Sequence, residues 1–172
     1  LDKTLASLSG FYYTDAEKMP SYQNADLPEQ TDLSLLDYAD TAIDCTMEKG
    51  SEGITVSNLG ADPNVVFPGV TSCFADDDKL YGLSLTVDAP DETEMAVYYQ
   101  TEGDEGFSAE KVYTFKVTED NRTWEHLVPG GITALRVDVS SPVESAVINN
   151  FELKSCDITE SGYTALKESR VD

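Results

Sequence analysis

The chain has 172 residues, and its 33 acidic and 11 basic side chains give it a formal net charge of −22 at pH 7. A surface this acidic repels phosphate backbones and anionic lipid headgroups, so we expect no nucleic acid partner and no membrane contact. The length suits one domain with a core. An apolar fraction of 40% with nine tyrosines indicates a folded chain rather than a disordered one.

The N-terminal forty residues differ from the rest. Residues 1–20 favour a short helix or two, and the segment QTDLSLLDYADT, residues 30–41, favours one more helical turn after Pro28. Their apolar side chains are too few for an independent core. We therefore predict that residues 1–42 form a short, partly helical N-terminal extension that packs on the main domain. Because the chain starts at Leu1 without a basic and apolar leader, we expect it to be part of a longer protein.

From residue 43 the apolar side chains recur with a period of two, which is typical of β-strands. In the segment YTFKV, Tyr113 and Phe115 share one face, while Thr114 and Lys116 share the other. Clusters of Gly, Pro, Asn and Asp bound most of these segments, as in antiparallel strands joined by turns. The nine predicted strands are 43–48, 53–58, 64–67, 80–87, 94–100, 111–117, 123–128, 134–139 and 146–154.

Strands with one apolar and one polar face predict an all-β protein with an antiparallel two-sheet β-sandwich. We expect a jelly roll over residues 43–156, followed by a polar tail over residues 157–172. An immunoglobulin-like arrangement is less well supported because its Cys–Trp–Cys order is absent. The single Trp124 lies outside the interval between Cys45 and Cys73.

The three cysteines, Cys45, Cys73 and Cys156, lack the CxxC spacing of zinc sites, and only one histidine accompanies them. We therefore expect no zinc. Two arrangements of the thiols stay open. Either all three are buried free thiols, or Cys45 and Cys156 form a disulfide across neighbouring first and last strands and leave Cys73 free.

A family resemblance rests on four segments in chain order: GITVSNLGADPNVVFPGV, LYGLSLTVDA, MAVYYQTEGDEGFSAEKVYTFKV and ITALRVDVSSPVESAVINNFELK. Their marks are the Asp62-Pro63 pair, a Tyr-Tyr strand before an acidic hairpin, a Leu-Arg-x-Asp strand and a closing VINNFEL strand. Together they resemble a galactose-binding-like jelly roll of the kind appended to bacterial membrane-bound glycosyltransferases and cell-envelope proteins. The resemblance implies the fold of a carbohydrate-binding module, a non-catalytic role and an extracytoplasmic, bacterial location.

Arg136 is one of only three arginines in the chain, and it stands in the middle of a predicted strand. Asp138 is two residues further on, so both side chains leave the strand on the same face. In one interpretation the planar guanidinium donates hydrogen bonds to sugar hydroxyls. In the other it forms a structural pair with Asp138, Asp62 or another carboxylate across the sheet, which the large excess of acids favours.

Aromatic side chains supply the second part of the candidate site, and the residues that could provide a stacking platform for a sugar ring are Tyr81, Tyr98, Tyr99, Phe74, Phe107 and Trp124. Tyr98 and Tyr99 point to opposite faces of their strand, so at most one packs in the core, and the other is a candidate platform for a sugar ring. Gln100 shares a face with Tyr98. The alternative is that both rings pack against other parts of the protein. The predicted ligand-binding residues are Arg136, Asp138, Tyr98, Tyr99, Gln100 and Trp124.

Two acidic loops, residues 76–78 and 102–105, hold the carboxylates that calcium prefers, but neither has the EF-hand spacing. A structural calcium ion is the one cofactor that the sequence leaves open, and its ligands are not specified. No catalytic motif is present, because His126 is the only histidine and GxSxG, HExxH and Walker-type glycine loops are absent. We therefore expect that the protein is not an enzyme.

These observations predict a non-catalytic carbohydrate-binding module in an extracytoplasmic part of a bacterial envelope or secreted protein. Its expected partners are a polysaccharide or other glycan and further domains of the parent protein. The alternative is a structural spacer or interaction domain attached to a membrane-bound glycosyltransferase. A groove that holds a Trp or Tyr side chain favours the first function, and a convex outer surface lined by Ser and Thr favours the second.

Overall fold

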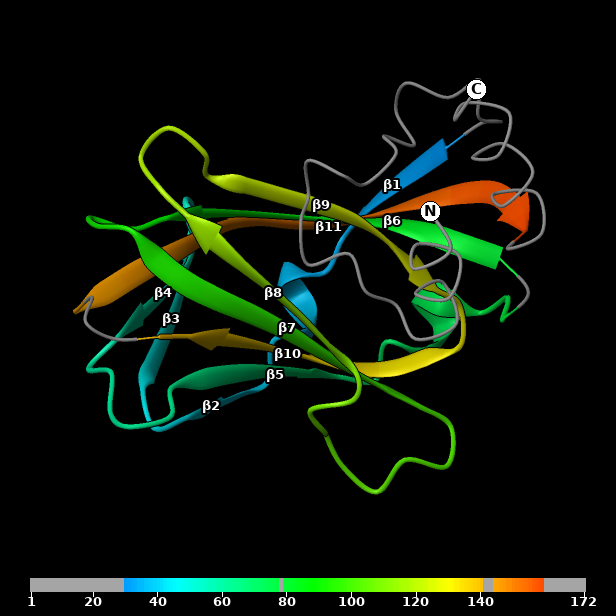
Figure 1. The fold of residues 1–172 in the computed structure, drawn as a ribbon, viewed down its shortest axis with the longest axis horizontal. Coiled ribbons are helices and arrows are strands. Elements are labelled where there is room, and N and C mark those ends of the chain that lie inside the picture. Colours follow the sequence, from blue (N-terminus) through cyan, green and yellow to red (C-terminus); the bar gives the residue numbers. More distant parts are fainter. Residues whose placement is uncertain (1–29, 78, 141–143, 160–172) are drawn as a thin grey trace.

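Two antiparallel sheets make up the computed structural model, which describes residues 30–77, 79–140 and 144–159 (Figure 1). In sheet 1, β1 and β4 pair with successive segments of β11, β3 pairs with β4, and β6 and β9 follow on the other side of β11. The strands of sheet 1 are β1 (Gln30–Ser34), β3 (Thr46–Gly50), β4 (Gly53–Ser57), β6 (Lys79–Asp88), β9 (Thr123–Pro129) and β11 (Ser145–Thr159).

Sheet 2 has five strands in the order β2-β5-β10-β7-β8. They are β2 (Thr41–Ile43), β5 (Asn64–Pro68), β7 (Thr93–Thr101), β8 (Val112–Val117) and β10 (Ile132–Val139). The helical elements of the described residues are two 3-10 turns, η1 (Leu36–Tyr38) and η2 (Thr71–Phe74). The prediction of an all-β protein with two antiparallel sheets is confirmed.

The core lies between the sheets, and the alternation of side chains along each strand builds it. On β10, Leu135 and Val137 point inward and are fully buried, and on β6 Leu83 does the same from the opposite sheet. Phe67 and Phe151 meet edge to face with their ring centroids 5.0 Å apart, one ring from each sheet. Burial of this apolar surface stabilises the sandwich, and on β10 it leaves Arg136 and Asp138 on the other side, where both side chains are half-buried.

Eight of the nine predicted strands are present, and the strand predicted over residues 43–48 is wrong. The chain pairs with sheet 2 up to Ile43 and with sheet 1 from Thr46. Asp44 stands between them with φ of 57°, a conformation that ends a strand and that Asp adopts more readily than most residues. Its carboxylate accepts a hydrogen bond from the backbone N–H of Asp62 at 2.6 Å, which holds this crossing point in place.

The sandwich begins before the boundary expected at residue 43. β1 pairs with residues 152–156 of β11, and the single helical turn expected after Pro28 is the short η1. β11 also continues to Thr159, into the segment expected to be a polar tail. The helices expected over residues 1–20, and the rest of the extension and tail, lie outside the described residues.

Cys45 and Cys73 are free thiols, so the disulfide between Cys45 and Cys156 that the sequence left open is not formed. The Cys45 thiol donates a hydrogen bond to the carbonyl oxygen of Asn64 at 3.5 Å. Partial burial raises the pKa of this thiol and keeps it protonated at neutral pH. Of Cys156, the structure describes the backbone, which pairs with Gln30.

We expect the substitution Gly53→Ala to destabilise the protein by more than about 1 kcal/mol. Gly53 has φ of +123°, and an added Cβ would lie 2.0 Å from the carbonyl oxygen of Ile148, a backbone atom of the neighbouring strand that cannot move aside. Gly50, its partner in the β3–β4 hairpin, has open space at the Cβ position and is the matched control. Urea unfolding of both variants tests this, and equal losses for the two would contradict it.

Candidate functional site

The outer face of sheet 2 brings together four of the six predicted ligand-binding residues. On β10, Arg136 and Asp138 point away from the core, because their neighbours Leu135 and Val137 fill it. On β7, Tyr98 lies directly opposite Arg136. Gln100 follows two residues later, so it shares this face with Tyr98.

Arg136 and Asp138 form a bidentate ion pair. The guanidinium donates through Nε to Oδ1 at 2.6 Å and through Nη2 to Oδ2 at 2.7 Å. The side chains are 21% and 15% exposed, so the pair is shielded from most of the solvent. The hydrogen bonds to Asp138 raise the pKa of Arg136, although burial opposes this. The structural pairing favoured by the sequence is therefore present, and its fork geometry fixes the plane of the guanidinium.

Two aromatic rings flank this guanidinium. Its Cζ atom lies 4.3 Å from the ring centroid of Tyr98 and 5.6 Å from that of Phe107. Both distances fall within the range of cation–π interactions. The result is a half-buried patch of two aromatic rings, Tyr98 and Phe107, around the guanidinium of Arg136, which we call the Tyr98–Arg136 patch.

Phe107 belongs to this patch although it is not among the six predicted ligand-binding residues; the sequence offers it only as one of several aromatic side chains for a stacking platform. It stands in the β7–β8 loop, in the segment EGDEGFSAE, where every neighbour is small or polar. A single aromatic side chain in an otherwise polar loop is a signal for a packing or binding role. The sequence does not specify which strand the loop folds against.

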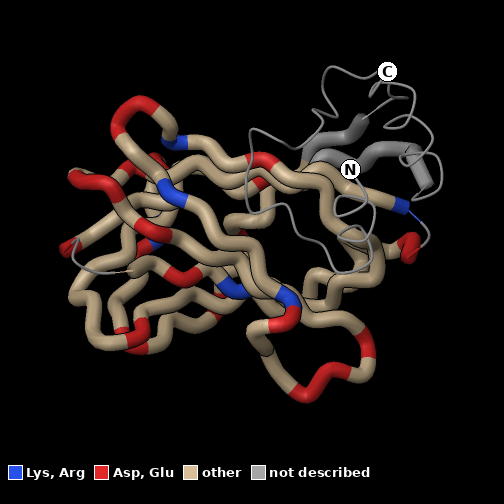
Figure 2. Tube along the Cα trace, viewed as in Figure 1, with Lys and Arg blue, Asp and Glu red and all other residues tan. Residues whose placement is uncertain are grey.

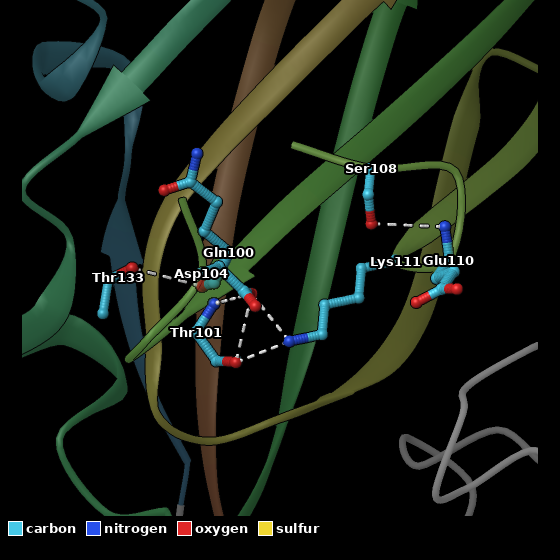
Figure 3. Close-up of polar contacts among 7 residues, drawn as sticks. All are labelled: Gln100, Thr101, Asp104, Ser108, Glu110, Lys111 and Thr133. Atoms are coloured by element: carbon cyan, nitrogen blue, oxygen red, sulfur yellow. Dashed lines mark hydrogen bonds and ion pairs between the residues drawn. The ribbon is translucent and has the colours of Figure 1, made fainter. Parts of the chain in front are cut away.

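A hydrogen-bonded anchor orders the base of this loop (Figure 3). Asp104 accepts from the backbone N–H of Thr101 at 2.9 Å and from Nζ of Lys111 at 2.6 Å. Lys111 also donates to Oγ1 of Thr101 at 2.7 Å. The hydrogen bond from Lys111 lowers the pKa of Asp104. Asp104 is therefore engaged in holding the loop that carries Phe107, rather than open to a cation.

A shallow hollow of about 610 Å³ lies beside the Tyr98–Arg136 patch on the same face. Polar and charged residues provide most of its lining, and Tyr98 is one of the lining residues. The lining includes Glu94, Ala96, Tyr98, Thr114, Lys116 and Asp138. Such a surface offers hydrogen bonds to a hydroxyl-rich molecule next to a ring that can stack on it.

Tyr99 and Trp124, which the sequence analysis placed in the ligand-binding site, are instead buried. They are 3% and 2% exposed and belong to the core. Tyr99 stacks on Tyr113 at 5.7 Å, and Trp124 stacks on Phe115 at 4.8 Å with 7° between the ring planes. Neither ring has a face open to a ligand. Together with His126, these side chains form the aromatic cluster where β8 approaches β9.

His126 is buried within this aromatic cluster, with its ring centroid 4.6 Å from that of Tyr113. Its Nδ1 lies 2.7 Å from the carbonyl oxygen of Leu127. Burial lowers the pKa of His126 to about 4, so the ring is neutral at pH 7. A neutral ring sealed in the core is placed to pack, and it lies away from the outer face of sheet 2.

In the part of the chain that the structure describes, His, Cys, Asp and Glu side chains do not gather in a group of three that is able to hold a metal ion. The calcium ion left open by the sequence stays a prediction. Over the same residues, the structure contains no helix with the length and apolar character to cross a membrane.

The fold is the jelly roll of carbohydrate-binding modules. The chain is similar to the low-affinity xylan-binding module CBM86 from Roseburia intestinalis, with 11% identity, 76% of this chain and 97% of that chain covered, and a TM-score of 0.54. The C-terminal CBM6 of the laminarinase LamC from Zobellia galactanivorans matches at 13% identity, with coverage of 74% and 99% and a TM-score of 0.46. The second N-terminal cellulose-binding domain of β-1,4-glucanase C from Cellulomonas fimi matches at 15% identity, with coverage of 73% and 95% and a TM-score of 0.49. No protein-family model and no curated protein matches the chain.

Proposed function

We propose that this protein is a non-catalytic carbohydrate-binding module and that the outer face of sheet 2 is its ligand surface. The observation that carries this proposal is the Tyr98–Arg136 patch, which lies beside a polar hollow on an outer sheet face. The carbohydrate-binding-module fold is consistent with it, and the family resemblance in the sequence supports it further. An extracytoplasmic place in a bacterial envelope or secreted protein is part of the same proposal.

The chemistry of the patch suits a sugar chain. The apolar face of a pyranose ring stacks on an aromatic ring such as Tyr98 or Phe107. Hydroxyl groups then find donors and acceptors in Gln100 and in the carboxylate of Asp138, which keeps lone pairs beyond those used by Arg136. Because the ion pair is already formed, the surface is ordered before the ligand arrives, which reduces the entropic cost of binding.

One observation favours the alternative of a structural spacer or interaction domain. The guanidinium of Arg136 is already engaged by Asp138 and lies over the ring of Tyr98, so part of the aromatic surface is covered within the protein itself. A face whose polar groups are satisfied internally is also a stable surface for contact with a neighbouring domain. Binding measurements separate the two functions.

We expect Tyr98→Ala to weaken polysaccharide binding by about tenfold or more, equivalent to about 1.4 kcal/mol. Titration calorimetry with xylan, laminarin and hydroxyethyl cellulose measures this. Tyr98→Phe keeps the ring and retains most of the affinity if stacking provides the binding energy. Thr123→Ala, an exposed position on sheet 1, is the control that leaves the affinity unchanged. If the wild-type protein binds none of the three polysaccharides, the spacer function replaces this proposal.

A further inference from the structure

The basic side chains of sheet 2 and its β7–β8 loop are each paired with a carboxylate. Among the described residues these cations are Lys111, Lys116 and Arg136. The paired nitrogen and oxygen atoms are 2.6 Å apart for Lys111 and Asp104, 3.0 Å for Lys116 and Glu92, and 2.6 Å for Arg136 and Asp138. A ligand that carries its own negative charge therefore finds each of these cations already in an ion pair.

Arg136 is the cation at the centre of the Tyr98–Arg136 patch, and it is the least available of the three. Asp138 occupies its Nε and Nη2 donors at once, and the Tyr98 ring lies against the guanidinium. A ligand carboxylate or sulfate would have to displace a carboxylate that sits two residues away on the same strand. The protein's own carboxylate has the advantage of being held in place covalently.

Further negative charge surrounds the same hollow. Glu94 lines it and is exposed, and Asp62 acts electrostatically on Arg136 from the loop before β5. Acidic residues also occupy loops at both ends of the sandwich, where basic residues are few (Figure 2). Lys111, Lys116 and Arg136 are each paired with a carboxylate, so they do not offset the remaining negative charge around the hollow. An anionic chain that approaches the hollow is therefore repelled.

We propose that the outer face of sheet 2 selects uncharged polysaccharides and rejects uronate-containing and sulfated chains. This inference rests on the proposed function and names the chemical class of its ligand. The uncharged hydroxyls of a neutral chain take the remaining lone pairs of Asp138 and the amide of Gln100 without breaking an ion pair. A charged chain gains no free cation and encounters Glu94.

Two pairs of probes that differ in charge test the selection: hydroxyethyl cellulose against carboxymethyl cellulose, and highly methyl-esterified pectin against its de-esterified form. Affinity gel electrophoresis at pH 7 compares retardation by each member. We expect the neutral member of a bound pair to bind at least about tenfold more tightly than the charged one at low salt. This difference in affinity becomes smaller in 1 M NaCl, because the Debye length falls to about 3 Å and the repulsion of the charged probe is screened.

Two variants then locate the selecting charges. Glu94→Gln removes the exposed carboxylate of the hollow, and Asp138→Asn releases the charge of Arg136 while keeping a hydrogen-bond acceptor. For each variant we expect the ratio of the affinity for the neutral probe to the affinity for the charged probe to fall by about two- to fivefold at low salt. Glu48→Gln, which removes one exposed carboxylate from β3 in sheet 1, is the matched control and leaves this ratio unchanged.

The outcomes separate this inference from the proposed function. Equal binding of the charged and neutral members overturns the selection and leaves the carbohydrate-binding function in place. The same holds if Glu48→Gln lowers the affinity ratio as much as Glu94→Gln does, because the effect then comes from net charge alone. Absence of binding to every probe, and to xylan and laminarin, overturns both proposals together.

Discussion

Replacing Trp124 with alanine is expected to lower the free energy of unfolding by about 3–5 kcal/mol. The indole is 2% exposed and packs between both sheets, stacked on Phe115 and 5.5 Å from the ring centroid of Tyr113. Its removal leaves a cavity in the aromatic cluster that surrounding side chains fill only in part. A loss of this size takes away a large share of the stability of an ordinary domain.

Thermal and urea unfolding followed by circular dichroism measure the loss, and a fall in Tm of about 6–20 °C corresponds to it. Trp124→Phe is the matched variant, expected to cost less than about 2 kcal/mol. It keeps a stacking ring and removes an indole N–H that has no hydrogen-bond partner in the described part of the protein. Where the alanine variant still folds, its polysaccharide affinity should equal that of the wild type. A selective loss of binding with unchanged stability would return Trp124 to the ligand surface.

The sequence predicts the position of Arg136 on the outer face correctly, whereas it places Trp124 in the site although the ring lies in the core. The two strands show why. β10 has a strictly alternating segment, ALRVDV, so the outward direction of Arg136 and Asp138 was predictable. β9 has the segment TWEHLVP, in which Leu127 is buried although it points away from the face of Trp124. Because the core face also carries His126 and the opposite face carries Leu127, the pattern of this strand does not say which face meets the core.

Other differences arise from contacts that are distant in sequence. The strand pairing breaks at Asp44, where the sequence has no Gly or Pro that would predict a break. The break is held by the hydrogen bond from the backbone N–H of Asp62 to the carboxylate of Asp44. The place of Phe107 depends on how the β7–β8 loop folds back, which the Asp104–Lys111 pair helps to fix. Local patterns predict strands and their faces well, whereas chain crossings and loop positions follow from tertiary packing.

The strand residues of the proposed ligand surface come from the predictable part of the fold, whereas Phe107 in the β7–β8 loop does not. Tyr98 and Arg136 are cross-strand neighbours, so their contact follows once β7 and β10 are adjacent and in register. What the sequence left undecided was whether Arg136 serves structure or ligand. The structural use is present, because the ion pair with Asp138 holds the guanidinium with its Cζ 4.3 Å from the centroid of the Tyr98 ring. Contact of Arg136 with a ligand stays a prediction.

The stability of the protein should fall by about 3 kcal/mol between pH 6.5 and pH 4 because of His126 alone. Its pKa in the folded state is lowered to about 4 by burial, whereas an unfolded histidine has a pKa near 6.5. Between these values the unfolded state binds a proton that the folded state does not. The stabilisation is therefore fully present above about pH 6.5 and is lost as the pH falls through this window.

The measurement is the free energy of unfolding from urea titrations at half-unit pH steps, compared between the wild type and His126→Gln. His126 is the only histidine in the chain, so the difference between the two slopes over pH 4–6.5 isolates its contribution from that of the carboxylates. The variant is expected to be less stable at pH 7 and to show a flatter slope. Parallel slopes, or an imidazole NMR signal that titrates near pH 6.5 in the folded protein, would mean that His126 is accessible to solvent and that the aromatic cluster is open where β8 approaches β9.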